Sequence, residues 1–162
     1  MARLLERASV VLALVGGGVL VAAALLATVS ILGRWLADAP IAGDIELMQV
    51  ACAVAIALAL PYCQWHAGHV TVDFFTQRAA AAARRGLDRA GHALTAVVML
   101  LLAWRAGVGV ADMKAAGETT MLLAVPTWVT YMAMVPGLLL SALVALHAVF
   151  APAADHERVV GP

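Results

Sequence analysis

The chain has 162 residues and equal numbers of basic and acidic residues, ten of each. Hydrophobic residues make up 64% and charged residues 12%, whereas soluble domains contain about 50% and about 25%. A soluble domain of this length cannot bury so much apolar surface, so the composition predicts an all-α membrane protein with one domain. The charges form no basic block, and we expect no nucleic-acid partner.

The first apolar stretch, residues 8–33, carries no charge and follows Arg3 and Arg7. A basic segment before an apolar one is typical of a signal peptide, but the apolar region of a signal peptide has only ~7–15 residues. A membrane-spanning helix needs about 20 apolar residues. The length therefore predicts an uncleaved first transmembrane helix.

The second stretch, residues 47–65, is also uncharged and predicts a second transmembrane helix. It contains an alanine ridge, a set of small residues at helical spacing: Ala51, Ala53, Ala55, Ala57 and Ala59. Small residues four positions apart let two membrane helices approach closely. We expect close packing along this ridge, either within the chain or against another subunit.

The third and fourth spans are predicted at about 88–108 and 125–150. The uncharged part of the third span lies between Arg89 and Arg105, so these side chains must reach toward the membrane interface. The fourth span contains Pro136, which removes one backbone hydrogen bond and predicts a kink.

The distribution of Lys and Arg predicts the orientation of the chain. Basic residues are enriched in cytoplasmic segments of membrane proteins. With the N-terminus inside, seven basic residues lie in inner segments and three in outer ones, so we expect both termini in the cytoplasm. The inner residues are Arg3, Arg7, Arg78, Arg84, Arg85, Arg89 and Arg158, and the outer ones are Arg34, Arg105 and Lys114.

Residues 70–86, between the second and third spans, combine Phe74 and Phe75 with an alanine run and arginines. The phenylalanines need an apolar environment, which favours an amphipathic helix along the cytoplasmic membrane interface. A solvated hairpin with a short helix is the alternative. The transmembrane domain is expected to cover residues 1–151, followed by a disordered tail, 152–162.

The central parts of the four predicted spans contain no ionisable side chain. Ionisable groups at membrane depth mark the pathways of pumps and transporters, so the sequence argues against an autonomous transporter and against a membrane-embedded hydrolase. Histidines near the predicted inner face offer an alternative, because two facing histidines in a four-helix bundle can hold a haem. We favour interfacial polar roles for these residues: His66, His69, His92 and His147.

Four carboxylates lie on the predicted outer side. Asp44 and Glu46 precede the second span, where negative side chains stabilise a helix N-terminus, and we expect them to act as caps. Contact with a partner is the alternative. Asp112 and Glu118 in the third loop fit either a solvated acidic loop or contact with a basic patch on a periplasmic protein.

Short polar motifs follow a defined order along almost the whole chain, from Arg3 to Phe150. The motifs are Glu46, Pro61-Tyr62, Gly68-His69-Val70-Thr71-Val72-Asp73, Gly117-Glu118-Thr119-Thr120, Val125-Pro126-Thr127-Trp128, Tyr131 and Pro136-Gly137. In this order they resemble the DctQ-like small membrane subunit of tripartite ATP-independent periplasmic (TRAP) transporters. The residues after the second span and the Pro-x-Trp before the fourth are the most specific parts of this resemblance.

The resemblance implies a non-catalytic subunit without a cofactor in the bacterial inner membrane, surrounded by membrane lipid. It implies a large, sodium-coupled elevator subunit as partner and a periplasmic binding protein that delivers an organic acid anion, such as a dicarboxylate, a keto acid or a sialic acid. It further implies that the chain serves as a scaffold, and that its large partner is a separate polypeptide. The residues that match the family pattern are expected to have structural or interface roles: Glu46, His69, Asp73, Glu118, Pro126 and Trp128.

Two other classes of function remain open from the sequence. One is a four-helix membrane redox subunit that binds haem or quinone, and a pigment-free, metal-free purified protein would argue against it. The other is a small channel or exporter built as a homo-oligomer, which the uncharged span centres disfavour.

Overall fold

A computed structural model describes residues 2–38, 41–66 and 81–150, which form four helices. Within these ranges, β structure is limited to one isolated bridge. All four helices are long and apolar enough to cross a membrane, so the prediction of an all-helical fold with four helices of spanning length and composition is confirmed for the described residues. Their bounds are α1, Ala2–Ala37; α2, Asp44–Trp65; α3, Ala81–Ala116; and α4, Thr127–Phe150.

Two of the helices are longer than a bilayer requires. Both α1 and α3 have 36 residues, about 54 Å at ~1.5 Å per residue, against a hydrocarbon thickness of about 30 Å. Residues 81–86, expected at the end of the interfacial helix, form the beginning of α3. The rest of that helix, residues 70–80, and the tail 152–162 lie outside the described residues.

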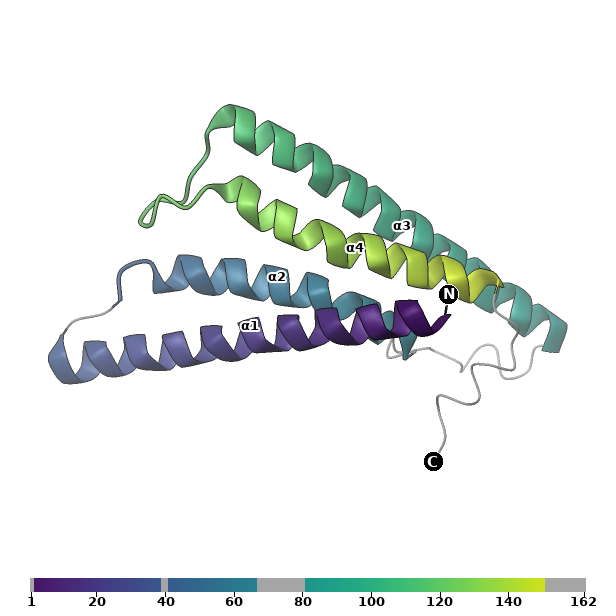
Figure 1. The fold of residues 1–162 in the computed structure, drawn as a ribbon, viewed down its shortest axis with the longest axis horizontal. Helices are drawn as coiled ribbons and strands as arrows, with labels where there is room; N and C mark the ends of the chain where they lie inside the picture. Colours follow the sequence, from purple (N-terminus) through teal and green to yellow (C-terminus); the bar gives the residue numbers. More distant parts are fainter. Residues whose placement is uncertain (1, 39–40, 67–80, 151–162) are drawn as a thin grey trace.

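The four helices lie in a row in the order α1, α2, α4, α3 (Figure 1). Helix α1 packs on α2, α2 packs on α4 and α4 packs on α3, whereas α1 makes only a small contact with α4. The inner helices α2 and α4 are therefore covered on two sides, and the edge helices α1 and α3 on one. A row has no enclosed centre, so most apolar side chains face outward.

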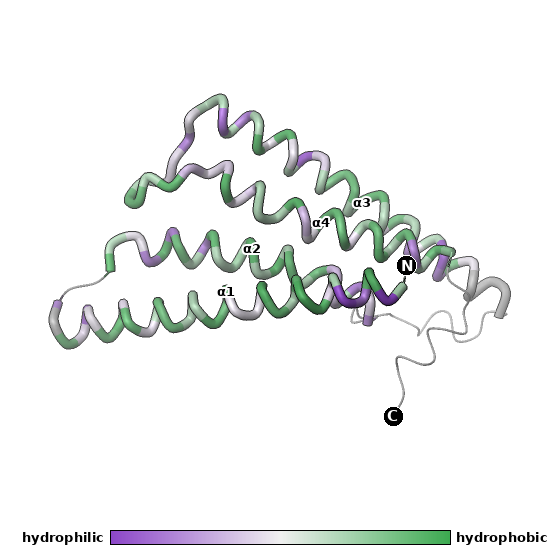
Figure 2. The backbone as a smooth tube through the Cα atoms, viewed as in Figure 1, coloured by the Kyte–Doolittle hydropathy of each residue, from purple (hydrophilic) through white to green (hydrophobic). Residues whose placement is uncertain are grey.

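Hydrophobic residues cover most of the length of all four helices (Figure 2). In the most apolar part of α4, 33% of the residues are buried, whereas in α1 and α3 the share is 11%. Exposed large side chains on the edge helices include Leu14, Leu25, Val97 and Leu101. Lipid or another membrane protein must cover these surfaces, because water exposure of so much apolar area is unfavourable.

Helix α2 approaches both of its neighbours closely through the alanine ridge. A Cβ atom on Gly16 of α1 would lie 2.9 Å from the carbonyl oxygen of Ala55. On the other side, a Cβ atom on Gly137 of α4 would overlap the carbonyl oxygen of Ala57. Ala55 and Ala57 are both buried. The ridge therefore packs within the chain at its centre, which settles the question that the sequence left open.

Pro61 explains why the carbonyl of Ala57 is directed at α4. A residue in an α-helix donates its N–H to the carbonyl four positions earlier, and proline has no N–H to donate. Pro61 lies inside α2, fully buried, so the carbonyl of Ala57 lacks its usual partner. That carbonyl faces the backbone of Gly137, where only glycine leaves enough room.

The second close contact of α4 is with α3. Ala103 and Ala106 of α3 and Leu138 of α4 form a buried apolar cluster. Partly buried side chains from three helices surround this cluster: Leu60, Met99 and Val135. Leu60 belongs to α2, so the cluster joins the α3–α4 pair to α2.

The close approach at Gly137 predicts that a single methyl group is harmful there. Gly137→Ala is expected to lower the free energy of unfolding by about 1–3 kcal/mol, because the added Cβ forces α4 away from α2. Gly107→Ala is the matched control, since a Cβ at Gly107 meets nothing within 4 Å and alanine favours a helix over glycine. The measurement is thermal unfolding of the purified protein in mild detergent. Equal melting temperatures for the two variants would contradict the close approach.

A second prediction concerns the α1–α2 contact. Ala55→Leu is expected to destabilise the chain by a similar amount, because three additional carbons must fit beside Gly16. The control is Ile56→Leu at the next position, where the side chain is exposed and the change should be nearly neutral. The same thermal assay measures both variants, and a wild-type melting temperature for Ala55→Leu would show that α1 and α2 separate without cost.

Candidate functional site

Long-range hydrogen bonds made by Ser30, Asp44 and Glu46 lie at one end of the row. The two helical hairpins, α1–α2 and α3–α4, lie close together at the end near the N-terminus and diverge toward the other end (Figure 1). The end of α1, residues 41–43 before α2 and the 117–126 loop lie at this diverging end. The site is built from these two connections and the helix ends beside them.

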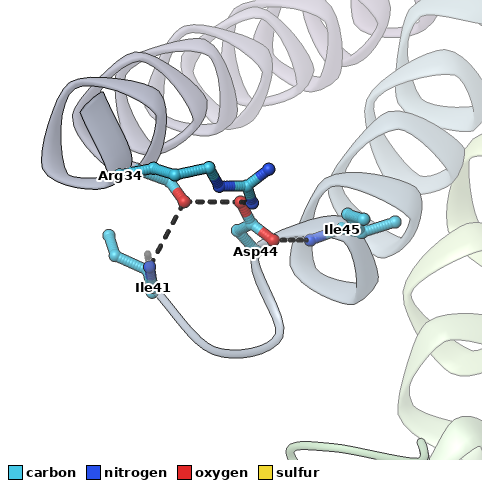
Figure 3. Close-up of polar contacts among 5 residues, drawn as sticks. Arg34, Ile41, Asp44 and Ile45 are labelled. Atoms are coloured by element: carbon cyan, nitrogen blue, oxygen red, sulfur yellow. Dashed lines mark hydrogen bonds and ion pairs between the residues drawn. The ribbon is translucent and has the colours of Figure 1, made fainter. Parts of the chain in front are cut away.

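A small polar network joins α1 to the beginning of α2 (Figure 3). The buried hydroxyl of Ser30 donates a hydrogen bond to the carboxylate of Asp44 and accepts one from the N–H of Ile41 at 3.3 Å. The guanidinium of Arg34 lies 4.0 Å from the same carboxylate. The network fixes the turn between the two helices, and its ion pair adds little because Arg34 is largely exposed.

The beginning of α2 differs from the capping arrangement expected from the sequence. The N-cap is Gly43, in the left-handed conformation with φ of 79°, and no side chain caps the helix. Asp44 does accept a hydrogen bond from the adjacent N–H of Ile45, at 2.8 Å. The expectation that Asp44 and Glu46 act as N-caps was wrong. Both lie in the first helical turn, where their negative charge still suits the helix dipole.

The 117–126 loop is a short hairpin held by its threonines. Thr120 donates its N–H to the carbonyl of Val125 at 2.9 Å, and its hydroxyl accepts the N–H of Val125 at 3.1 Å. At the base, both the N–H and the hydroxyl of Thr127 bind the carbonyl of Glu118. Ala124 at the tip adopts a positive φ of 51°. These bonds give the tip a defined conformation.

Glu46 connects the two helical hairpins. Its Oε1 accepts a hydrogen bond from the N–H of Leu122 at 2.9 Å, and its Oε2 accepts one from the N–H of Leu123 at 3.2 Å. We call this pair of bonds the Glu46 bridge. The charged carboxylate is a strong acceptor, so the bridge ties the loop of one hairpin to the first turn of the other.

Leu123 reinforces the bridge by packing on Gly43. A Cβ on Gly43 would overlap the side chain of Leu123, and the positive φ of Gly43 independently disfavours any other residue. Glycine at this position therefore serves two purposes. It starts α2 in a left-handed conformation and makes room for the tip of the loop.

Three other residues that match the family pattern lie in or beside the loop. Glu118 contributes its backbone carbonyl to the base of the loop, while its side chain is exposed. Pro126 pairs with Thr119 in the isolated bridge. Trp128, in the first turn of α4, stacks beneath the ammonium of Lys114, 5.5 Å from its ring centre. His69 and Asp73 lie outside the described residues.

The structure therefore brings Glu46, Glu118, Pro126 and Trp128 to the same end of the molecule. It also includes residues that the sequence reading did not single out: Ser30, Gly43 and Leu123. A glycine just before the acidic first turn of a span was an available signal for the N-cap, because glycine is among the residues found there and adopts a positive φ without strain. Nothing local in the sequence indicated the contact between Gly43 and Leu123.

Two histidines at the opposite end, His66 and His147, interact with aromatic rings. His66 lies against Tyr62, with ring centres 4.2 Å apart, and His147 lies 5.7 Å from Trp65. Among residues 2–38, 41–66 and 81–150, no three His, Cys, Asp or Glu side chains gather as a metal site. A row of helices also lacks the enclosed bundle centre in which two histidines face each other. The arrangement gives no support to the redox alternative.

The Glu46 bridge predicts different effects for two substitutions at one position. Glu46→Ala removes both acceptors and is expected to lower the melting temperature and loosen the loop. Glu46→Gln keeps one side-chain oxygen, so its effect is expected to be about half as large. Glu118→Ala is the control, because Glu118 uses its backbone carbonyl. Hydrogen exchange of the Leu122 and Leu123 amides measures the bridge directly, and unchanged exchange in Glu46→Ala would contradict it.

Comparison with known proteins agrees with this architecture. The family model for the DctQ component of tripartite ATP-independent periplasmic transporters matches residues 23–155, which include α2, α3, α4, both connections at the diverging end and the last part of α1, residues 23–37. No curated protein matches the chain significantly. The family match extends over more than half of the chain and confirms the resemblance seen in its motifs. The chain belongs to the DctQ-component family of TRAP transporters.

Proposed function

We propose that the chain is the non-catalytic small subunit of a TRAP-type secondary transporter. It scaffolds a separate large, sodium-coupled elevator subunit, which takes up an organic acid anion delivered by a periplasmic binding protein. The observation that carries this proposal is the family match over residues 23–155. The identity of the anion depends on the two partner proteins.

The distribution of charged residues favours a structural role for this chain over a role in ion conduction. Residues 8–33, 47–65 and 90–104, and the whole of α4, contain no Asp, Glu, Lys or Arg. A sodium or proton pathway through these helices needs polar or ionisable groups at membrane depth. The transport sites therefore belong to the large subunit in this proposal.

The row of helices also suits a scaffold. A closed bundle hides its apolar residues in its own centre, whereas a row leaves both faces and both edges available to a partner. The edge helices α1 and α3 are more than 50 Å long by the helical rise. A long, rigid, apolar edge can hold the static part of a large membrane subunit through close helix packing.

We further propose that both termini are cytoplasmic and that the diverging end with the Glu46 bridge faces the periplasm. Support comes from the seven basic residues of the inner segments against three in the outer ones. In this orientation the 117–126 loop lies on the side from which a binding protein would approach. Both termini then lie on the opposite side.

Purification from the native host tests the assignment of the partner. The tagged chain, extracted in mild detergent, is expected to carry along a large membrane protein of many spans in stoichiometric amount. Deleting the chain is expected to abolish sodium-dependent uptake of the ligand of the associated binding protein. Ala55→Leu should reduce both complex yield and uptake, whereas Ile56→Leu should leave both unchanged.

Three outcomes would contradict the proposal. They are purification of the chain alone as a homo-oligomer, co-purification of a bound chromophore, and flux mediated by the chain itself in liposomes. The first and third outcomes favour a small channel, and the second favours a redox subunit. Membrane-impermeant labelling of single cysteines placed at residue 38 and at residue 118, both exposed, tests the orientation, since both positions must react from the periplasmic side.

A further inference from the structure

We propose that the tip of the 117–126 loop is a membrane-surface anchor. In this proposal Met121 and Leu122 insert their side chains at the boundary between lipid headgroups and acyl chains, and the Glu46 bridge holds them there. The proposal requires only that the four helices span a membrane. It is independent of the partner subunits and of the transported solute.

The length of the uncharged part of α2 determines where the loop lies relative to the hydrocarbon core of the membrane. Residues 47–65 are 19 uncharged residues, about 28 Å at ~1.5 Å per residue, which nearly equals the hydrocarbon thickness of about 30 Å. Glu46 is the first charged residue outside this stretch. Because the N–H groups of Leu122 and Leu123 bind its carboxylate at 2.9 and 3.2 Å, the loop tip lies at the hydrocarbon boundary.

The chemistry of the tip suits lipid. Residues 119–127 contain no charged side chain. Met121 is 99% exposed and Leu122 is 71% exposed, so neither side chain finds a protein environment within the described chain. The charge of Glu46 is directed at the loop backbone. The remaining surface is small, neutral and apolar, which fits an interfacial lipid contact better than the charged surface of a water-soluble protein.

The exposure of these side chains is imposed by the fold of the loop. Thr120 and Val125 close the hairpin, and Leu123 is fixed against Gly43. With Leu123 lying against Gly43, the side chains of Met121 and Leu122 are left exposed. A loop with the same sequence and no internal bonds would be free to fold its apolar side chains back onto the helices.

Exposed apolar side chains are also present on the two helices that begin beside the loop tip. Ile45 in the first turn of α2 and Val129 in the first turn of α4 are exposed. Farther along α4, Met132 is exposed as well. Trp128 lies beside the loop, and indole rings favour the same interfacial level. The membrane surface that covers the ends of α2 and α4 therefore also reaches the loop tip.

Site-directed spin labelling of the full chain tests the anchor. The label is placed at Met121→Cys in a Cys52→Ala, Cys63→Ala background, since both native cysteines are free, and the protein is reconstituted in phospholipid vesicles. Apolar oxygen partitions into the bilayer, whereas a water-soluble nickel complex does not. The ratio of oxygen to nickel accessibility at position 121 is expected to be severalfold higher than at the control, Glu118→Cys at the base of the loop.

Two results at position 121 would overturn the proposal. A ratio equal to that at position 118 would place the tip in water. Low accessibility to both oxygen and nickel would show that protein covers the tip. If the accessibility is low only when the co-purified large subunit is present, that subunit is the protein that covers it. A second label at Leu122→Cys guards against a local effect of the first and must give the same result.

The role of the Glu46 bridge is tested in the same labelled protein. Glu46→Ala is expected to lower the oxygen-to-nickel ratio at position 121 toward the value at 118, because the tip is no longer held at the boundary. Glu46→Gln should give an intermediate ratio. The control is Asp112→Ala, an exposed carboxylate on α3, which should leave the ratio unchanged. An unchanged ratio in Glu46→Ala would show that the bridge does not position the tip.

Discussion

The close approach of α2 to both of its neighbours is the constraint on which the rest of the structure depends. Gly16 of α1 and Gly137 of α4 bring helix backbones against the buried alanines of α2. In a membrane, water drives little association between helices, and close van der Waals packing of small residues takes its place. Because these two contacts lie on different sides of α2, they arrange the helices in a row with α2 inside it.

The arrangement in a row explains why the two helical hairpins need a second contact at the end where they diverge. The helical hairpins diverge away from the N-terminus (Figure 1), so helix packing alone leaves their ends apart. The 117–126 loop spans this separation and binds Glu46 on α2. The two ends of the row are thus held together by different kinds of interaction. One relies on close backbone packing of apolar helices, and the other uses charge-assisted hydrogen bonds from the loop backbone to a carboxylate.

Much of the fold followed from the sequence because lipid imposes a simple rule. A backbone in hydrocarbon must satisfy its hydrogen bonds locally, so long apolar stretches become helices. The small residues of α2 likewise indicated close packing before its partners were known. The role of Glu46 was misread for a physical reason. An acidic residue in a first helical turn suits an N-terminus, and only the distant loop, more than 70 residues later, offers it better donors.

The sequence by itself determined that this chain has four segments long and apolar enough to cross a membrane as helices, and which family it resembles, because apolar length and motif order are local properties. Only the tertiary structure decided that the helices form a row, that Gly137 faces the carbonyl freed by Pro61, and that Leu123 lies on Gly43. These contacts join residues far apart in the chain. Their existence depends on how helices cross, which no short stretch of sequence specifies.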